Sequence, residues 1–423
     1  MKPATPPDWQ ICAKNLQSSK AIIVKNLNVK DQYVLLRVDF NVPIKDGIIQ
    51  DDTRIVKSLD TIRYLLDQKA KVIVMSHLGR PLKELTADGQ LDVQKFSLKP
   101  IAEKLEALLQ TQVLFASDCG GPDSLSKRSQ LLSGGILLLE NTRFHKGEEK
   151  GDPQLAQQLA VLGDFFINDA LGAAHREHAS TATIARYFDK DHKAFGLLMQ
   201  SEVENGQRVL KNPHKPCTAI IGGAKVSDKI LLISNLMEFC DSILIGGGMA
   251  YTFLNAQGFE IGNSLCEKDK LELALELIAL AKAKNVQLLL PNDSVVAKNF
   301  EDSTATLITD HPAIPLEHMG LDIGPKTIER YTSVILKSKT ILWNGPMGVF
   351  EKAAFSNGTK DVALAIAAAT TKGAYSLVGG GDSVSAIKKF KLGDQVSFVS
   401  TGGGAMLEML EGKVLPGIEA ILN

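Results

Sequence analysis

The sequence predicts an α/β protein in which short parallel strands alternate with helices. Three observations indicate this class: apolar runs rich in Val, Ile and Leu end abruptly in Gly, Asn, Asp or His, the runs are apolar throughout, and a helical pattern follows each. Parallel strands covered by helices on both faces have this appearance. The polar residues then lie at the carboxyl ends of the strands, where open parallel sheets bind ligands.

The runs form two groups that differ in their terminal residues. Up to about residue 200 they are YVLLRVDFN, KVIVMSHLGRP, GILLLENTRFH and FFINDALGAAHREH. After about residue 212 most end in glycine, as in CTAIIGGAKVSDKI, SILIGGGMAYTF, TILWNGPMG and YSLVGGGDS. Between the groups, LMQSEVENGQRVLKNPHKP fits a helix that Pro213 and Pro216 stop. We therefore expect two domains joined by a helix, which a length of 423 residues also favours.

Composition excludes several classes of function. The 47 basic and 48 acidic residues give a net charge of −1, which offers no support for a general nucleic-acid or membrane-surface role. No apolar stretch reaches the roughly 18 residues that span a bilayer, and MKPATPPDWQ has no apolar signal-peptide core. Five cysteines without a CxxC pair argue for a reducing compartment and against structural zinc. We expect a cytoplasmic protein.

Glycine clusters mark four strand-to-helix junctions in the second half, at Gly222–Gly223, Gly246–Gly248, Gly379–Gly381 and Gly402–Gly404. Glycine lets backbone N–H groups approach an anion, and the helix N-terminus adds partial positive charge. One such junction could serve strand–helix packing alone, whereas four favour phosphate binding. The chain contains no GxxxxGK[ST], so it is not a P-loop NTPase. It also has no GxGxxG after a strand, which disfavours a nicotinamide-dependent oxidoreductase.

Charged residues near these junctions have two interpretations each. Lys225 and Lys229 are four residues apart, so we expect them on one helix face, either against phosphates or in solvent. Asp382 could cap a helix, hold Mg²⁺ on a nucleotide, or do both. Glu351 could accept hydrogen bonds from a ribose or lie on the surface, and Trp343 is expected in the core rather than stacked on a base.

The first half places basic residues at or beside predicted strand ends: Arg37, Arg54, His77, Arg80, Arg143, His145, His175, Arg176 and His178. Arginines that converge on one rim form an anion site with bidentate geometry. We therefore expect a small substrate that carries phosphate or carboxylate groups. Asp39 and Asn41 could bind its hydroxyl groups, or serve only the turn before Pro43. HREH lacks a third ligand, so no metal site is expected there.

Ten motifs, in order, resemble the phosphoglycerate kinase family from about residue 20 onward. They are RVDFNVP, SHLGRP, ENTRFH, DALGAAHREHAS, GGAKVSDKI, GGGMAYTF, GLDIGP, WNGPMGVFE, GGGDS and STGGGAMLEMLEG. The resemblance implies two doubly wound parallel-sheet (Rossmann-like) domains, with residues 1–198 binding the triose and 212–410 the nucleotide. A hinge helix at 199–211 would join them, and residues 411–423 would return to the first domain. It also implies a monomer that converts 1,3-bisphosphoglycerate and MgADP to 3-phosphoglycerate and ATP.

The resemblance assigns site residues motif by motif. Substrate-binding residues would be Asp39, Phe40, Asn41, Arg54, His77, Leu78, Gly79, Arg80, Arg143 and Arg176. Nucleotide-binding residues would be Lys225, Lys229, Gly320, Asn344, Glu351, Gly380, Gly381, Asp382 and Ser383. Arg54 and Lys225 would be catalytic, and Asp382 would face the Mg²⁺ carried by ATP or ADP.

The implied chemistry needs no general base, because the acceptor oxygen is anionic in either direction. What remains is to align two polyanions, neutralise the moving phosphoryl group and close the domains against water. Another two-lobed phosphotransferase and a non-catalytic nucleotide-binding protein stay as alternatives. Leu171, Ala173 and Ser383 depart from the family's usual Phe, Thr and Thr, but none removes a charge. The first ~20 residues match nothing in the family, so we expect a disordered tail or a start placed too early.

Overall fold

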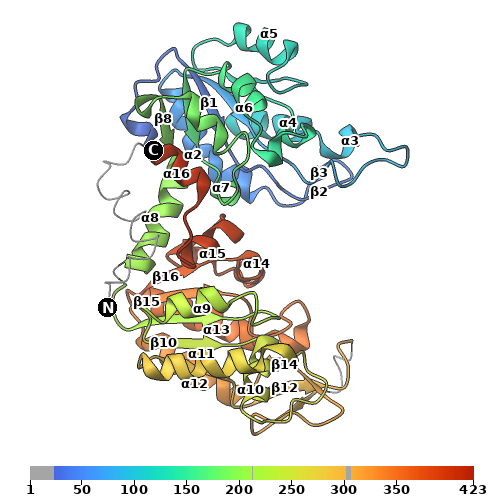
Figure 1. Cartoon of the computed structure of the whole chain (residues 1–423), viewed down its shortest axis with the longest axis vertical. Helices are drawn as coiled ribbons and strands as arrows, with labels where there is room; N and C mark the ends of the chain where they lie inside the picture. The colour runs from blue at the N-terminus through green and yellow to red at the C-terminus, as the bar shows by residue number, and fades with distance from the viewer. Residues whose placement is uncertain (1–22, 212, 302–305) are drawn as a thin grey trace, which may run out of the picture. The chain divides into compact units, whose positions relative to one another are not determined.

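The computed structural model describes residues 23–211, 213–301 and 306–423 (Figure 1). The described chain divides into two compact units. The first runs up to Glu204 and also takes in Lys413–Asn423, and the second is Asn205–Gly412. The tail expected in the first ~20 residues lies outside the described part of the chain. Among the described residues, no helix has the length and apolarity to cross a bilayer.

The first unit is built on a six-stranded sheet of order β5-β6-β4-β1-β7-β8. Its strands are β1 Tyr33–Arg37, β4 Lys71–Met75, β5 Val113–Phe115, β6 Ile136–Leu138, β7 Phe165–Asn168 and β8 Lys193–Phe195. Every pairing in this sheet is parallel. The carboxyl ends of β6, β4, β1 and β7 therefore meet at one edge. A short antiparallel hairpin, β2 Ile44–Lys45 and β3 Ile48–Ile49, follows β1.

Helices alternate with these strands as the sequence predicts. They are α2 Thr53–Asp67, α3 Val93–Phe96, α4 Lys99–Leu109, α5 Pro122–Gln130, α6 Pro153–Ala160 and α7 Leu171–Ala174. Side chains of α2 and α4 join those of β1, β4 and β6 in one apolar core, where Ile55, Ile62 and Leu105 are fully buried. Burying a side chain of this size contributes roughly 1.5–3 kcal/mol. This core fixes the sheet edge that carries the polar residues.

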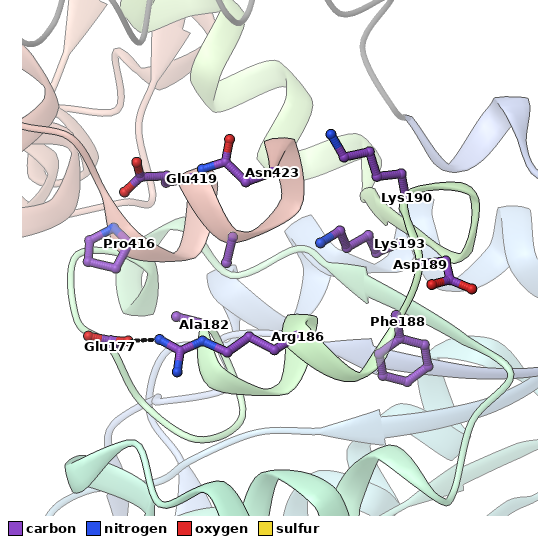
Figure 2. Close-up of a pocket in the computed structure, with 11 residues that line it drawn as sticks. Glu177, Ala182, Arg186, Phe188, Asp189, Lys190, Lys193, Pro416, Glu419 and Asn423 are labelled. Carbon is purple, nitrogen blue, oxygen red and sulfur yellow. Dashed lines mark hydrogen bonds and ion pairs between the residues drawn. The ribbon is translucent and has the colours of Figure 1, made fainter.

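The C-terminal helix α16, Pro416–Leu422, lies against the first unit, beside α7, β8 and the 3₁₀ helix η4 Thr183–Tyr187 (Figure 1). Ile418 and Ile421 are buried there, and Asn168 Nδ2 donates to the Gly417 carbonyl at 3.1 Å. A pocket lies between α16 and the segment from η4 to β8, with Lys193 and the Glu177–Arg186 ion pair among its lining residues (Figure 2).

The second unit has its own six-stranded parallel sheet, of order β11-β10-β9-β15-β16-β17. Its strands are β9 Cys217–Ile221, β10 Ser242–Ile245, β11 Gln287–Leu289, β15 Thr340–Asn344, β16 Tyr375–Val378 and β17 Phe398–Val399. All residues of the four central strands are buried, so both faces of the sheet are covered. Two such parallel sheets confirm the α/β prediction.

A smaller antiparallel sheet, not expected from the sequence, completes the second unit. It has the order β13-β12-β14, formed by β12 Ser294–Ala297, β13 Leu307–Ile308 and β14 Met319–Ile323. The helices of the unit are α9 Ile230–Leu236, α10 Met249–Ala256, α11 Leu271–Ala283, α12 Pro325–Lys337, α13 Asn357–Thr371, α14 Gly381–Lys389 and α15 Gly404–Leu410. Residues of α12, α13 and α14 pack against β9, β10, β15 and β16 around the fully buried Trp343.

Helix α8, Leu197–Lys211, contains the boundary between the two units. Its first turn is fixed in the first unit, where Leu197 N donates to Thr61 Oγ1 at 3.0 Å and Met199 N to Asp169 Oδ1 at 2.9 Å. Asp169 directly follows β7 and is fully buried, and burial raises the pKa of its carboxyl group to about 6. The end of a central strand thus determines where this helix begins.

Candidate functional site

The polar edge of the first unit is organised around Asp39, two residues beyond β1. Arg54, in the first turn of α2, forms an ion pair with Asp39 at 3.1 Å and donates to the Asn41 carbonyl at 3.0 Å. The backbone N–H of Asn41 also donates to Asp39 Oδ1 at 3.1 Å. The turn interpretation of Asp39 therefore holds, and the carboxylate also orients Arg54, whereas its binding to substrate hydroxyl groups stays a prediction. Arg54 keeps about a third of its side chain exposed.

His77, two residues beyond β4, lies behind this pair and next to a buried arginine. Arg37 Nη2 is 3.1 Å from His77 Nδ1, and because arginine only donates, Nδ1 accepts and the ring proton sits on Nε2. His77 Nε2 is 4.0 Å from Asp39 Oδ1. Burial, followed by the charge of Arg37, lowers the pKa of His77 well below its usual 6.5. The ring is therefore a neutral N–H donor.

Arg37, which the residue pattern places at this rim although the family resemblance does not assign it to the site, lies buried behind His77. It is fully buried, its Nε donates to Ser180 Oγ at 2.8 Å, and Ser180 Oγ donates to Glu148 Oε1 at 2.5 Å. Burial lowers the pKa of Arg37, whereas Glu148 and Asp39 raise it. The motif RVDFN contains Arg37, but only the fold shows that it faces a histidine 40 positions away.

The loops after β4 and β6 are tied together by Asn141. Its Oδ1 accepts from Leu78 N at 3.1 Å and from Arg143 N at 3.0 Å. Arg143 Nη1 then donates to the Gly79 carbonyl at 2.7 Å, and Gly79 N donates to Asn41 Oδ1 at 2.9 Å. Hydrogen bonds thus join residues from three neighbouring loops into one surface.

The predicted substrate residues do not all present side chains to this surface. Phe40 and Leu78 lie in the core, so only their backbone is available at the edge. Arg80 is exposed just beyond Gly79. Arg176 Nε lies 3.0 Å from His175 Nε2. It faces a pocket that is lined by Glu149, Lys150, Gly151, Arg176, Glu177 and His178.

The second unit brings three glycine-rich loops into backbone contact. Gly222 N donates to the Asn344 carbonyl and Gly247 N to the Met347 carbonyl, both at 2.9 Å. A Cβ on Gly222 would lie 1.9 Å from the Pro346 carbonyl oxygen, so no larger residue fits. These loops follow β9, β10 and β15, which are adjacent in the sheet. The close approach leaves a surface rich in backbone at the carboxyl edge.

Lys229 is held at this edge by Asn344, the last residue of β15. Asn344 is buried, and its Oδ1 accepts a hydrogen bond from Lys229 Nζ while its Nδ2 donates to the Gly379 carbonyl at 2.7 Å. Burial lowers the pKa of Lys229, and the charges of Glu411, Asp228 and Asp382 oppose that effect. The lysine is therefore near the carboxylate that the sequence predicts to hold Mg²⁺.

The expectation that Lys225 and Lys229 share a helix face is wrong. Helix α9 begins at Ile230, and both lysines lie in the preceding loop. Glycines at 222 and 223 let this loop turn back over the edge of the sheet before the helix starts. Both lysines therefore precede the helix, and their spacing of four does not place them on one helix face. Lys225 is exposed, whereas Lys229 is half-buried.

Asp382 lies in the first turn of α14, not at its cap position. The cap residue is Gly380, whose φ of +90° is strained for any residue with a Cβ. Ser383 Oγ accepts from Gly345 N at 2.5 Å, which ties α14 to the loop after β15. No cluster of three or more His, Cys, Asp or Glu suited to a metal ion occurs among the described residues. A single carboxylate fits a Mg²⁺ that keeps phosphate oxygens and water as its other ligands.

Gly320 lies outside the three glycine-rich loops, whereas Glu351 lies at the end of the one that follows β15. Gly320, on β14, donates its N–H to Ser264 Oγ at 2.9 Å, and a Cβ there would lie 2.0 Å from the Tyr251 ring. Glu351 is exposed at the end of the loop that follows β15, and its carbonyl accepts from Lys389 Nζ at 3.1 Å. The Glu351 carboxylate is therefore presented on the surface of the second unit.

Comparison with known proteins decides the family. The family model described as phosphoglycerate kinase matches residues 24–413. The chain belongs to the phosphoglycerate kinase family. The resemblance inferred from ten motifs is thereby confirmed. The match spans both units and includes the polar edge of each.

Curated relatives match almost the whole chain. The chain is 50% identical over 406 residues to the phosphoglycerate kinase of Akkermansia muciniphila and 49% identical over 403 residues to that of Thermosipho africanus, covering 95% of this chain and 98% of each relative. Solved structures agree. The phosphoglycerate kinase of Coxiella burnetii gives a TM-score of 0.84 at 42% identity, and that of Pyrococcus horikoshii gives 0.79 at 31%. Each comparison covers 95% of this chain and 98% of the other.

Proposed function

We propose that the chain reversibly transfers the acyl phosphate of 1,3-bisphosphoglycerate to MgADP, giving 3-phosphoglycerate and ATP. It is thus an ATP:3-phosphoglycerate 1-phosphotransferase of glycolysis, running in reverse in gluconeogenesis. The observation that carries the proposal is the family match across both units, together with a basic edge on one unit and glycine loops on the other.

The triose substrate binds the basic edge of the first unit. Arg54, Arg80, Arg143 and Arg176 neutralise its phosphate and carboxylate groups, because guanidinium groups bind such anions with two parallel hydrogen bonds. His77 supplies a neutral N–H, which suits an oxygen without adding charge. Asp39, Asn41 and the backbone at Phe40, Leu78 and Gly79 complete the contacts to the hydroxyl and carboxylate oxygens.

The nucleotide binds the carboxyl edge of the second unit. Lys225 and Lys229 approach the phosphates, and the backbone N–H groups of Gly380, Gly381 and Ser383 at the start of α14 supply further donors. Asn344 orients Lys229, as its hydrogen bond indicates. Glu351 accepts from the ribose, and Gly320 lies at the nucleotide site.

Asp382 holds the Mg²⁺ that accompanies ATP or ADP. When bound, this ion would screen the negative charge of the phosphates. The protein itself contributes one carboxylate in the first turn of α14, where it also interacts favourably with the helix dipole.

Catalysis needs no proton transfer, because the attacking oxygen is a carboxylate or a diphosphate oxygen. Arg54 and Lys225, one from each unit, neutralise the phosphoryl group as it moves in line between donor and acceptor. The two substrates bind different units, so we expect a closing motion about α8 that also excludes water. The unit boundary within α8 supports this role for the helix.

We further propose that the protein is a cytoplasmic monomer with no nucleic-acid or membrane partner. The near-zero net charge supports the lack of a nucleic-acid or membrane-surface partner.

The proposed function is tested by a coupled assay with 3-phosphoglycerate and MgATP, with and without a chelator. We expect turnover that the chelator abolishes. A panel of other small carboxylic acids serves as control, and preferred transfer to one of them would favour a different two-lobed phosphotransferase. Nucleotide binding without transfer to any acid would indicate a non-catalytic binding protein.

A further inference from the structure

One buried carboxylate in the second unit is not explained by the proposed catalytic machinery. Asp322, on β14, is 1% exposed. Its Oδ2 accepts from Gly358 N at 2.7 Å and its Oδ1 from Ile323 N at 3.0 Å. A Cβ on Gly358 would lie 2.3 Å from Asp322 Oδ1, and a Cβ on Gly348 would lie at the same distance. Two glycines therefore press directly against the carboxylate.

The carboxylate caps a helix that does not cap itself. The N-cap residue of α13, Ser356, makes no side-chain capping bond. Asp322 supplies the acceptor instead, from a strand 36 positions earlier in the chain. The carboxyl oxygen thus satisfies an N–H group at the start of this 15-residue helix, which has no acceptor within the helix.

The same junction anchors the loop that carries Glu351. Val349 N donates to the carbonyl of Leu321, the residue before Asp322, at 2.9 Å. Met347 N donates to Thr359 Oγ1 at 3.1 Å, in the turn of α13 that Asp322 caps. Residues 345–351 are thus attached to both partners that Asp322 joins, β14 and α13.

We propose that Asp322 is a positioning residue for nucleotide binding. By joining β14 to the start of α13, it fixes residues 345–351 and so the place at which Glu351 meets the ribose. Asp322 does not touch the nucleotide and acts through Glu351. This inference rests on the proposed function, in which Glu351 is the ribose acceptor.

The test measures MgADP binding by titration calorimetry and the KM for ADP in the coupled assay. Asp322→Asn keeps the size of the side chain but replaces one of its two acceptor oxygens by an NH₂ donor, so one of the two backbone N–H bonds is lost. We expect MgADP to bind about tenfold more weakly and the KM for ADP to rise in parallel, with kcat changed less than about threefold. The matched control is Asp293→Asn. Asp293 is equally buried and caps α12 through Lys326 N and Thr327 N, both at 2.8 Å.

The control variant loses a helix cap of the same kind in the same unit, but the cap is that of α12 and not α13. We expect its MgADP affinity to stay within about twofold of wild type. Equal weakening in the two variants would mean that Asp322 acts only through general stability. An unchanged affinity in Asp322→Asn would overturn the proposal outright.

A double-mutant cycle tests the route through Glu351. Glu351→Gln alone weakens binding, and adding Asp322→Asn to it is expected to weaken binding less than about twofold further. Multiplication of the two single effects would show that Asp322 does not act through Glu351. Gly358→Ala offers a second perturbation, because its Cβ displaces the Asp322 carboxyl group while Asp322 and Glu351 themselves are both retained. It should also weaken MgADP binding, and unchanged binding would count against the proposal.

The outcomes separate this inference from the proposed function. If wild type binds MgADP but transfers no phosphoryl group to 3-phosphoglycerate, the proposed function fails. The double-mutant cycle, which is measured by MgADP binding, still tests the role of Asp322 in that case. If wild type does not bind MgADP, both fail together.

Discussion

Replacing Asp322 by asparagine should change how the stability of the second unit depends on pH. Burial, followed by the like charge of Asp361, raises the pKa of this carboxyl to about 8 from its ordinary 3.8, although the N–H groups of Gly358 and Ile323 oppose the rise. A folded-state pKa above the unfolded one means that the native state binds the proton more tightly. Stability is therefore lost as pH rises between about 4 and 8.

The size of the effect follows from the two pKa values. Across the whole interval the carboxyl would cost roughly 6 kcal/mol of unfolding free energy, at about 1.4 kcal/mol for each pH unit. From pH 5 to pH 7 this amounts to about 3 kcal/mol. Asparagine does not titrate, so over this interval the variant should gain that amount relative to wild type.

The assay is urea unfolding followed by the fluorescence of Trp343. This residue is fully buried in the core of the second unit, and changing the only other tryptophan, Trp9→Phe, makes the signal specific. Wild type and Asp322→Asn are compared in this background at pH 5, 6 and 7, with equal urea dependence required of both. A stability difference that stays constant within about 0.5 kcal/mol, or that moves toward wild type as pH rises, would refute the reasoning.

Three further outcomes follow from the site geometry. Arg54→Ala should lower kcat roughly 10²–10³-fold with MgADP affinity unchanged, and near-normal turnover would remove Arg54 from catalysis. Lys225→Met should lower kcat with little change in melting temperature, because Lys225 is exposed, whereas Lys229→Met should also lower the melting temperature by losing its bond to buried Asn344. The imidazole ¹⁵N shifts of His77 should show a ring that is still neutral below pH 6.5, because burial and neighbouring arginines lower its pKa. Because the unfolded chain then binds a proton at this histidine more readily than the folded protein, the contribution of His77 to the free energy of unfolding should be lost as pH falls below about 6.5. A ring that titrates near 6.5 in the folded protein would contradict this prediction.

The sequence predicted the parts of the fold that follow from local pattern. The run KVIVMSHLGRP, for example, gives both the strand Lys71–Met75 and the position of His77 just beyond it. Uninterrupted apolar strands identify a parallel sheet because both faces must be buried. The antiparallel sheet of β12, β13 and β14 was not predicted, because β13 has only two residues and the short strands pair over long loops.

The site was predicted as a set of residue types rather than as a geometry. Motif positions placed Arg54 and Asp39 at the same edge, and the structure pairs them directly. Spacing failed for Lys225 and Lys229, since glycine loops interrupt the helical period that the spacing assumes. Arg37 was expected at the basic rim, but its burial and its contact with His77 were not predicted, because they depend on strand pairing, which a single sequence does not reveal.

The return of α16 to the first unit makes the second unit an insertion within the first. Two polypeptide connections therefore join the units. A single proteolytic cut in α8 would leave the second unit covalently joined to Lys413–Asn423 alone, and that segment packs on the rest of the first unit without a covalent bond. The arrangement also sets an order for folding during synthesis. All of Asn205–Gly412 leaves the ribosome as one continuous stretch, whereas the first unit waits for Ile418 and Ile421 to fill its core. The half of the molecule that is translated first is completed last.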